Sequence, residues 1–296
     1  MEKLNYATEY SQALAQAFPY VLYFGALYNT PNNGRYRWVN SKTIEIPSIK
    51  TTGRVDADRD TISTAKRNYA NGWEPKTLSN FRKWSTLVHP RDIDETNHIA
   101  SIQNITQVYN EEQKFPEMDA YTISKIYADW AELGKTADTT ALTIENVLEV
   151  FDKLNKNMTD KRVPLNGRIL YCTSDVNELI KKAKDIIKTV NVKDGGTAYN
   201  RIVTDIDTVK IEVVPSELMK TVYDFTEGWQ AGTGAKQVNM FLVHPLAVIT
   251  PISYEFAELD PPSAGSEGKY VYYEESQEDV FILNKKADAI QFNMEA

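Results

Sequence analysis

The stretch that decides the fold lies near the N-terminus and reads Tyr36-Arg37-Trp38-Val39-Asn40-Ser41-Lys42-Thr43-Ile44-Glu45-Ile46. Apolar and polar residues alternate from residue 41 to residue 50, and this alternation predicts a β-strand. Residues 51–71 are strongly polar, and a second strand-like run spans residues 73–88. Two strands around a charged segment of roughly twenty residues predict a long hairpin, and loops of that length are usually functional.

Seven charged side chains of this hairpin are candidate contacts with another subunit: Arg54, Asp56, Asp58, Arg59, Asp60, Lys66 and Arg67. They have no evident partners in the nearby sequence except each other. Oppositely charged groups on a second subunit would set the register of such a contact. The alternating aspartates resemble the start of a calcium-binding loop, but that loop needs Gly at its sixth position and Glu at its twelfth. Thr61 and Arg67 stand there instead, so we predict no metal site.

Residues 1–35 contain many aromatic residues without a repeating apolar face. Four of them are candidate anchors of an N-terminal arm: Tyr20, Tyr23, Phe24 and Tyr28. Tyrosine buries its ring and keeps a polar tip, which suits a contact surface. Two interpretations stay open, namely an arm that lies on other surfaces and the first helix and loop of an ordinary domain.

The clearest helix of the middle region is predicted from Pro116 to Leu133. Pro116 suits a first helical turn, and Gly134 is a typical stop signal. Glu117 and Asp119 then stand near the positive end of the helix dipole. About 18 residues give a rod of roughly 27 Å. The apolar stripe of this helix, at helical spacing, consists of Ile123, Ile126, Tyr127 and Trp130.

The remaining chain divides into a mixed α/β block and a C-terminal set of strands. Helices are predicted over residues 143–158 and 175–187, the second with Ser174 as its N-cap. Strands of the block are predicted over residues 167–173, 209–214 and 239–243. The C-terminal strands are predicted over residues 247–256, 269–274, 280–283 and 290–292. Pro251 inside the first of these indicates an edge strand or a bulge.

The composition of the 296 residues fits one large domain or two ordinary ones. A net charge of −8 argues against tight nucleic-acid binding, which needs clustered Lys and Arg. Cys172 is the single cysteine, so an intrachain disulfide is excluded, and its place in a strand-like run indicates a buried, inert thiol. The apolar stretch at residues 18–27 is too short to span a membrane, and no signal peptide precedes it.

Enzymatic chemistry finds little support in the residue pattern. The three histidines, His89, His98 and His244, have no second ligand at metal-binding spacing. The Gly232–Lys236 segment lacks the adjacent Gly-Lys pair and the following helix of a phosphate loop. No Ser-His-Asp order with a strained nucleophile turn is present. We therefore predict no catalytic, cofactor-binding or metal site.

The order of these parts resembles the major capsid protein of tailed bacteriophages, with the Hong Kong 97-type fold. The match is clearest at three places: 36–46, Gly167–Thr173 and Val243–Val248. The resemblance implies an α+β fold whose predicted helix at 116–133 is the spine helix of a peripheral domain. The implied parts are an N-terminal arm at 1–40, an extended loop at 41–90, a peripheral domain at 91–139 and 246–296, and an axial α/β domain at 140–245.

The function implied by the resemblance is mechanical. Copies would form pentamers and hexamers and close into an icosahedral shell that encloses double-stranded DNA without specific binding. The implied partners are a separate scaffolding protein, since no fused scaffold precedes the arm, and a portal protein. The implied location is the virion, after assembly in the host cytoplasm and with no membrane contact. Two alternatives stay open: an encapsulin-type shell that stores cargo enzymes, and a soluble enzyme or binding module with residues 51–72 as a mobile lid.

Overall fold

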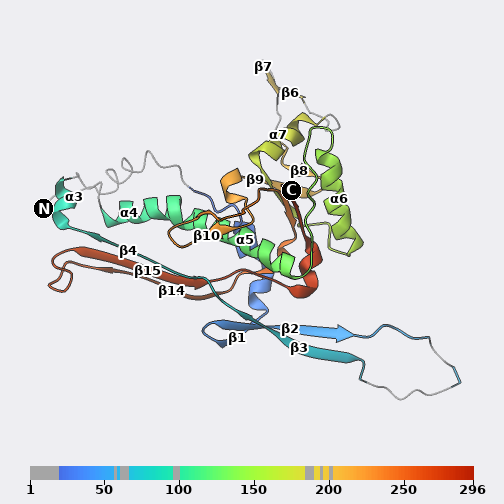
Figure 1. Ribbon diagram of the computed structural model, residues 1–296, viewed down its shortest axis with the longest axis horizontal. Helices are drawn as coiled ribbons and strands as arrows, with labels where there is room; N and C mark the ends of the chain where they lie inside the picture. Colours follow the sequence, from blue (N-terminus) through green and yellow to red (C-terminus); the bar gives the residue numbers. More distant parts are fainter. Residues whose placement is uncertain are drawn as a thin grey trace.

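The computed structural model describes residues 20–56, 59–60, 67–95, 101–183, 190–193, 196–199 and 203–296. A long helical rod lies at the centre of the molecule (Figure 1). A mixed α/β unit packs against its C-terminal part, a three-stranded sheet extends along its N-terminal part, and a hairpin projects away from both (Figure 1). The mixture of helices and sheets agrees with the predicted α+β class.

The α/β unit is built on a five-stranded sheet of order β17-β12-β5-β9-β8. The strands are β5 Ile169–Thr173, β8 Asp205–Ile206, β9 Val209–Val214, β12 Val238–Val243 and β17 Ile290–Met294. Only β5 and β9 of this sheet run parallel, which is the pairing that a crossover through a helix produces. Helices α6 (Val147–Asp160) and α7 (Ser174–Lys182) pack against it. The predicted strands at 167–173, 209–214 and 239–243 are therefore confirmed.

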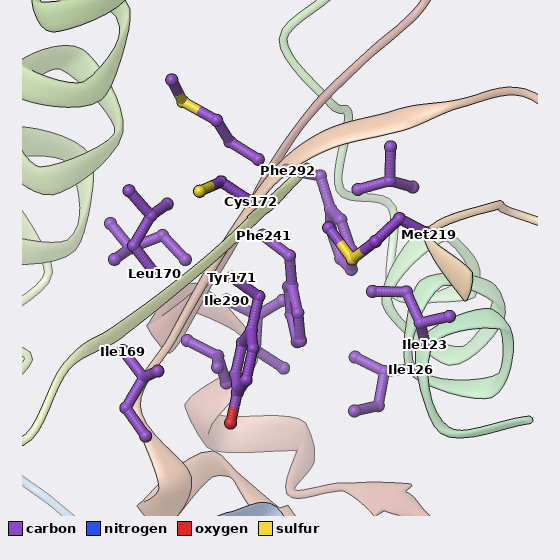
Figure 2. Packing of buried hydrophobic residues seen from close by; sticks show 14 of the residues in the cluster. Ile123, Ile126, Ile169, Leu170, Tyr171, Cys172, Met219, Phe241, Ile290 and Phe292 are labelled. Carbon is purple, nitrogen blue, oxygen red and sulfur yellow. The ribbon is translucent and has the colours of Figure 1, made fainter. Parts of the chain in front are cut away.

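The core lies where this sheet meets the rod. Figure 2 shows Tyr171, Phe241 and Phe292 on the side of the sheet that faces Ile123 and Ile126 of the rod. The Phe241 and Phe292 rings stack with their centroids 4.8 Å apart, and Tyr171 stacks on Phe241 at 5.7 Å. Offset aromatic stacks of this kind add to the stabilisation from burial. The C-terminal strand thus contributes directly to the core.

The rod is longer than the sequence predicted. Helix α4 (Ile102–Tyr109), the π-helix η3 (Asn110–Lys114) and helix α5 (Phe115–Glu132) follow one another without a break in helical backbone. The path is roughly 45 Å long at 1.5 Å per residue. Pro116 therefore does not open the helix, and the prediction that Glu117 and Asp119 meet a free helix end was wrong. The π-helix lies where Pro116 has no N–H to bond to the preceding turn.

In two three-stranded sheets, the strands begin and end at residues other than those predicted. One sheet has the order β1-β2-β3 and contains β1 Arg37–Asn40, β2 Thr43–Thr51 and β3 Tyr69–Thr77. The other has the order β14-β15-β4 and contains β4 Phe81–Val88, β14 Ile252–Asp260 and β15 Tyr270–Glu278. The single strand predicted over 73–88 is wrong, because the chain breaks after Thr77 and its two parts join different sheets.

A few other boundaries also differ from the sequence predictions. The run predicted over 247–256 is divided at Pro251 into β13 (Val248–Ile249) and β14. Thr173 caps helix α7 in place of Ser174, because its side chain accepts a hydrogen bond from the Val176 N–H. The remaining elements are α2 Gly25–Tyr28, η2 Pro31–Gly34, α3 Pro90–Glu95, β6 Val190–Lys193, β7 Gly196–Tyr199, η4 Ser216–Leu218, β10 Tyr223–Asp224, β11 Gln230–Ala231, η5 Pro245–Ala247, β16 Phe281–Ile282 and η6 Asn284–Ala289.

Candidate interaction surfaces

The β2–β3 hairpin is exposed on both faces over most of its length. Its two strands have nine residues each and extend about 30 Å. Apolar side chains stand in solvent along it, including Trp73, which is 44% exposed, and Val55 in the loop, which is 91% exposed. A narrow ribbon with no buried face is only marginally stable by itself. Most of the hairpin surface is thus exposed to solvent in the described part of the chain.

Five of the seven charged residues predicted for this hairpin lie within the described structure, at its far end. Asp58 and Lys66 fall outside the described residues. The other five are all exposed: Arg54, Asp56, Arg59, Asp60 and Arg67. Arg67 lies over the ring of Tyr69, with 4.8 Å between the guanidinium carbon and the ring centroid. The hairpin therefore presents these charges together, at the point farthest from its root.

Nearer the body, Arg37 of β1 makes two contacts with the strands of the hairpin. The Arg37 guanidinium lies 3.8 Å from the centroid of the Trp73 ring and donates a 2.7 Å hydrogen bond to Glu45. These contacts tie β1, β2 and β3 together on one face. Such a cation–π pair stabilises an exposed site by about 0.5–1 kcal/mol.

The hairpin is fixed to the body by a small apolar cluster at its root. Ile44 and Ile46 of β2 pack with Leu78, Ile249 and Phe281. Only this end of the ribbon is buried, and the rest of the hairpin projects from the body into solvent. The sequence alternation predicted the strand, but which of its apolar residues are buried depends on segments more than 150 positions away.

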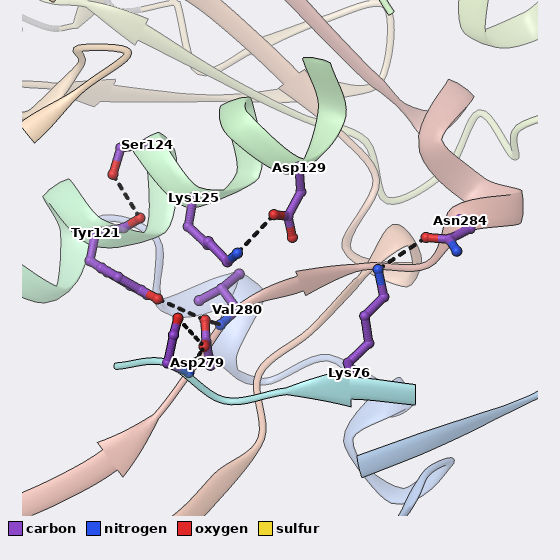
Figure 3. Close-up of polar contacts among 9 residues, drawn as sticks. Lys76, Tyr121, Ser124, Lys125, Asp129, Asp279, Val280 and Asn284 are labelled. Atoms are coloured by element: carbon purple, nitrogen blue, oxygen red, sulfur yellow. Dashed lines mark hydrogen bonds and ion pairs between the residues drawn. The ribbon is translucent and has the colours of Figure 1, made fainter. Parts of the chain in front are cut away.

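Asp279 joins the root to the rod through a set of hydrogen bonds (Figure 3). Its carboxylate accepts from the Ser79 N–H at 2.7 Å and from the Ser79 hydroxyl at 3.1 Å. The Tyr121 hydroxyl of α5 donates to it at 2.8 Å, and so does the Val280 N–H. Because Ser79 lies in the break between β3 and β4, this carboxylate holds both strands against the rod.

The four predicted arm anchors lie against this chain's own rod. Asp119 of α5 accepts hydrogen bonds from the Tyr20 hydroxyl at 2.6 Å and from the Tyr23 and Phe24 N–H groups, both at 3.0 Å. Tyr28 exchanges a 2.9 Å hydrogen bond with the Thr122 hydroxyl. Phe24 is fully buried. These residues therefore fix the end of the arm within the subunit, and residues 1–19 lie outside the described part.

The sequence did not lead us to predict Asp119 as a contact residue, although its position relative to the apolar stripe of the helix indicates burial. It precedes Ile123 by four residues and Ile126 by seven, so it stands on the apolar stripe of the helix. A carboxylate on such a stripe is buried and needs partners. Burial raises the pKa of Asp119 to about 6, although its three hydrogen bonds act in the opposite direction.

A second exposed surface is the outer face of the β14-β15-β4 sheet. The inner face packs on the rod, where Trp84 stacks on Tyr109 at 3.9 Å and Lys114 pairs with Glu274 at 3.2 Å. The outer face carries exposed Phe81, Leu87, Tyr254 and Phe256. Its strands are strongly acidic, since residues 252–278 contain seven Asp and Glu and a single Lys.

Comparison with solved structures identifies this arrangement. A chain of Mycobacterium phage Che8 matches with a TM-score of 0.64 and 12% identity, over 95% of this chain and 93% of that one. A chain of the cyanophage P-SCSP1u capsid matches with a TM-score of 0.63 and 12% identity, over 95% and 90%. The capsid of Myoviridae phage XM1 gives a TM-score of 0.58 and 9% identity, over 100% and 99%. This chain has a phage capsid fold.

The predicted resemblance to phage capsid proteins is thus confirmed at the level of the fold. No protein-family model matches the sequence, and no curated protein is significantly similar to it. At such low identities the fold persists while the side chains differ. Surfaces specific to this chain therefore have to be read from its own residues.

Within the described ranges, no cluster of three His, Cys, Asp or Glu side chains could hold a metal ion. Cys172 is buried, as predicted, and burial raises the pKa of its thiol to about 12. His244 caps η5 by accepting from the Leu246 N–H. None of the helices in the described residues combines the length and apolar character needed to cross a membrane.

Proposed function

We propose that this chain is a major capsid protein whose copies form pentamers and hexamers and close into an icosahedral shell around phage DNA. The observation that carries the proposal is a capsid fold with a hairpin exposed on both faces and fixed only at its root. Beyond its root, such a hairpin buries little apolar surface in its own subunit. A neighbouring subunit would bury it, and obligate interfaces of this kind bury on the order of 2,000–5,000 Å².

Charge complementarity indicates where the hairpin would dock. Residues 50–69 contain five Lys and Arg and three Asp. The strands and turn at residues 252–278 carry four exposed acidic residues beside exposed aromatic rings, namely Glu255, Glu258, Asp260 and Glu267. We propose that the hairpin of one copy lies on the β14–β15 surface of the next. Opposite charges would set the register, while the apolar side chains supply most of the affinity.

The other partners in the proposal are a separate scaffolding protein and a portal protein. The protein would be assembled in the host cytoplasm and end in the virion. Double-stranded DNA would be enclosed without specific contacts, because the chain carries a net charge of −8. No enzymatic step is part of the proposed function.

The test is to replace residues 54–68 with a short Gly-Ser linker and compare shell yield with subunit stability. We expect the free subunit to keep its unfolding temperature, because the segment is polar and loop closure changes by only about 0.6 kcal/mol per doubling of length. Shell yield, measured by light scattering and electron microscopy with co-expressed scaffold, should fall to background. A matched control replaces residues 226–227, in the exposed turn between β10 and β11 and outside both proposed surfaces, with Gly-Ser, and should leave shell yield unchanged.

Two outcomes would contradict the proposal. Normal shells from the hairpin variant would show that the hairpin takes no part in assembly. Only monomers or small closed dimers from the wild-type chain, across salt, concentration and scaffold co-expression, would exclude the capsid function itself.

A further inference from the structure

Asn166 and Gly167 form an exposed turn between helix α6 and strand β5. The chain has two other Asn-Gly pairs, at residues 33–34 and 71–72. At such a pair the Gly nitrogen can attack the Asn side-chain amide, because glycine has no side chain to obstruct the ring that forms. The reaction depends on the conformation around the pair, so the three pairs of one chain can differ in rate.

Both reacting groups of the 166–167 pair are free. The Gly167 N–H donates no hydrogen bond among the described residues, and the Asn166 side-chain amide makes none there either. Gly167 has a φ of +87°, which suits glycine, and it lies outside any helix or strand. No hydrogen bond of the attacking N–H or of the attacked side chain therefore has to break before they meet.

The other two pairs are held in place. The Asn33 side-chain amide donates to the Tyr28 carbonyl at 2.8 Å and to the Thr250 hydroxyl at 2.9 Å. Its oxygen accepts from the Thr250 N–H at 2.9 Å. Residues 71–72 lie in β3, in register with residues 48–49 of β2. Ring closure would break the hydrogen bonds at the first pair and pull the backbone out of its extended pairing at the second.

His244 makes a hydrogen bond to the peptide group that joins Asn166 to Gly167. Its Nδ1 accepts from the Leu246 N–H at 3.2 Å, so the neutral ring carries its proton on Nε2. The Nε2–H then donates to the Asn166 carbonyl oxygen at 3.1 Å. When the Gly167 nitrogen loses its proton, the negative charge spreads onto this oxygen. The hydrogen bond from His244 stabilises that charge and thereby activates the nitrogen.

Two cations act in the same direction as this hydrogen bond. Burial lowers the pKa of His244, and the charges of Arg168 and Lys286 lower it further against the effect of the bond to Asn166. The imidazole therefore stays neutral at neutral pH and keeps its proton on Nε2. Arg168 is buried, and the oxygens to which it donates are all uncharged. Its positive charge thus favours a negative charge that develops at Asn166.

We infer that Asn166 is a site of spontaneous deamidation in the folded chain, with His244 as the activating residue. The Gly167 nitrogen gives its proton to hydroxide from the solvent and bonds to the Asn166 side-chain carbonyl carbon. The bond from that carbon to the amide nitrogen breaks, and the nitrogen takes a proton from water and leaves as ammonia. Water then opens the succinimide ring at either carbonyl, which gives aspartate or isoaspartate. The inference rests on this turn alone and does not depend on the proposed function.

The experiment is incubation of the purified full chain at neutral pH, followed by trypsin digestion and mass spectrometry. Trypsin releases the three pairs in separate peptides, at residues 163–168, 4–35 and 68–76, and fragmentation locates the converted residue. We expect Asn166 to convert first, while Asn33 and Asn71 stay amides. In the same chain unfolded in urea, all three should convert at similar rates, because only the fold distinguishes them.

Two variants test the role of His244. His244→Asn keeps a side-chain acceptor for the Leu246 N–H but is too short to reach Asn166. It should slow conversion about tenfold, since a hydrogen bond to a charged group contributes about that factor to a rate. His89→Asn is the matched control, because the His89 Nδ1 also accepts from an N–H two residues ahead and lies outside this turn. It should leave the rate unchanged.

The unmodified pairs serve as an internal reference for folding. A variant that unfolds would speed the conversion of Asn33 and Asn71, so the rate at Asn166 is read relative to theirs. Conversion of Asn33 or Asn71 before Asn166, equal rates of all three in the folded chain, or no conversion at Asn166 would each overturn the site. Unchanged or faster conversion in His244→Asn would overturn the activating role of His244.

Discussion

At the scale of single residues, Asp119 shows how one buried carboxylate can fix a whole segment of chain. Three donors from residues 20–24 converge on it, yet burial still raises its pKa to about 6. The folded chain therefore holds a proton at this site more tightly than the unfolded chain, whose carboxyl has the ordinary pKa of 3.8. Folding and protonation are linked here.

The linkage predicts an unusual direction of pH dependence. A carboxyl whose pKa is raised by folding stabilises the folded state most at low pH and loses that contribution as the pH rises from about 4 to about 6. Asp119→Asn does not titrate. The free energy of unfolding of the wild-type chain, minus that of this variant, should therefore fall by about 2–3 kcal/mol across that window. Urea denaturation of the free subunit at several pH values measures it.

The control is Tyr28→Phe, which removes the hydrogen bond to Thr122 but keeps the carboxylate. This variant should lose stability by a similar amount at every pH, so its curve should run parallel to that of the wild-type chain. A wild-type advantage over Asp119→Asn that grows with pH would contradict the linkage.

Tyr171 gives a second prediction at this scale. Its ring is fully buried between Phe24 and Phe241, and its hydroxyl has no hydrogen-bond partner among the described residues. Tyr171→Phe removes an unsatisfied polar group and keeps the stacked ring. We expect the free energy of unfolding to stay the same or to rise by about 1 kcal/mol. Phe241→Leu, which removes a ring from the same stack, should instead destabilise the subunit, and a clear loss in Tyr171→Phe would reveal a hidden partner.

At the scale of elements, the root of the hairpin depends on Asp279. Asp279→Ala would leave the Ser79 and Val280 N–H groups without their acceptor and release Tyr121 of the rod. We expect a loss of roughly 2–4 kcal/mol, because the carboxylate is 1% exposed and its partners become unsatisfied. Thermal unfolding measures the loss. Tyr121→Phe removes only one of these bonds, so it should cost less, and an equal loss would contradict a cooperative role for the carboxylate.

The elements also show which parts of the fold can be predicted from the sequence. The period-2 alternation around Ile44 and the 3.6-residue stripe from Ile123 to Trp130 predict β2 and α5 because each period reports one buried face. The break after Thr77 could not be predicted in this way. Its strands continue with good local propensity, and the division comes from Asp279, which lies 200 positions away from Ser79.

The start of the rod was missed for a related reason. Pro116 is a good first-turn residue in isolation, and only the preceding π-helix allows it inside a longer helix.

One of the two candidate surfaces could be predicted from the sequence, and the other could not. The charges of the hairpin could be predicted as exposed, whereas the acidic and aromatic face of the β14-β15-β4 sheet depends on the pairing register. Register across distant strands is not encoded in local periodicity.

At the scale of the whole molecule, the charge distribution determines how strongly the chain binds nucleic acid. The net charge is −8, and the basic residues of the hairpin are interspersed with aspartates in the sequence. We predict no tight complex with duplex DNA at about 150 mM salt, because phosphate neutralisation requires clustered cations. A gel-shift or anisotropy titration over a range of salt checks it. A steep salt slope with tight binding to a defined duplex would contradict the prediction, and a basic DNA-binding protein in the same assay serves as the positive control.

Strand β17 completes the five-stranded sheet, and it is synthesised after all the other strands of that sheet. It pairs with β12 and places Ile290 and Phe292 in the core, yet it is translated only after residues 1–289. At 5–20 residues per second, synthesis of the segment between β12 and β17 takes roughly 2–9 seconds, and the growing chain has an open β12 edge and an incomplete apolar face during that time. A stalled or truncated chain keeps that face exposed to chaperones and proteases. A chain that stops before residue 290 therefore cannot complete the sheet or its core.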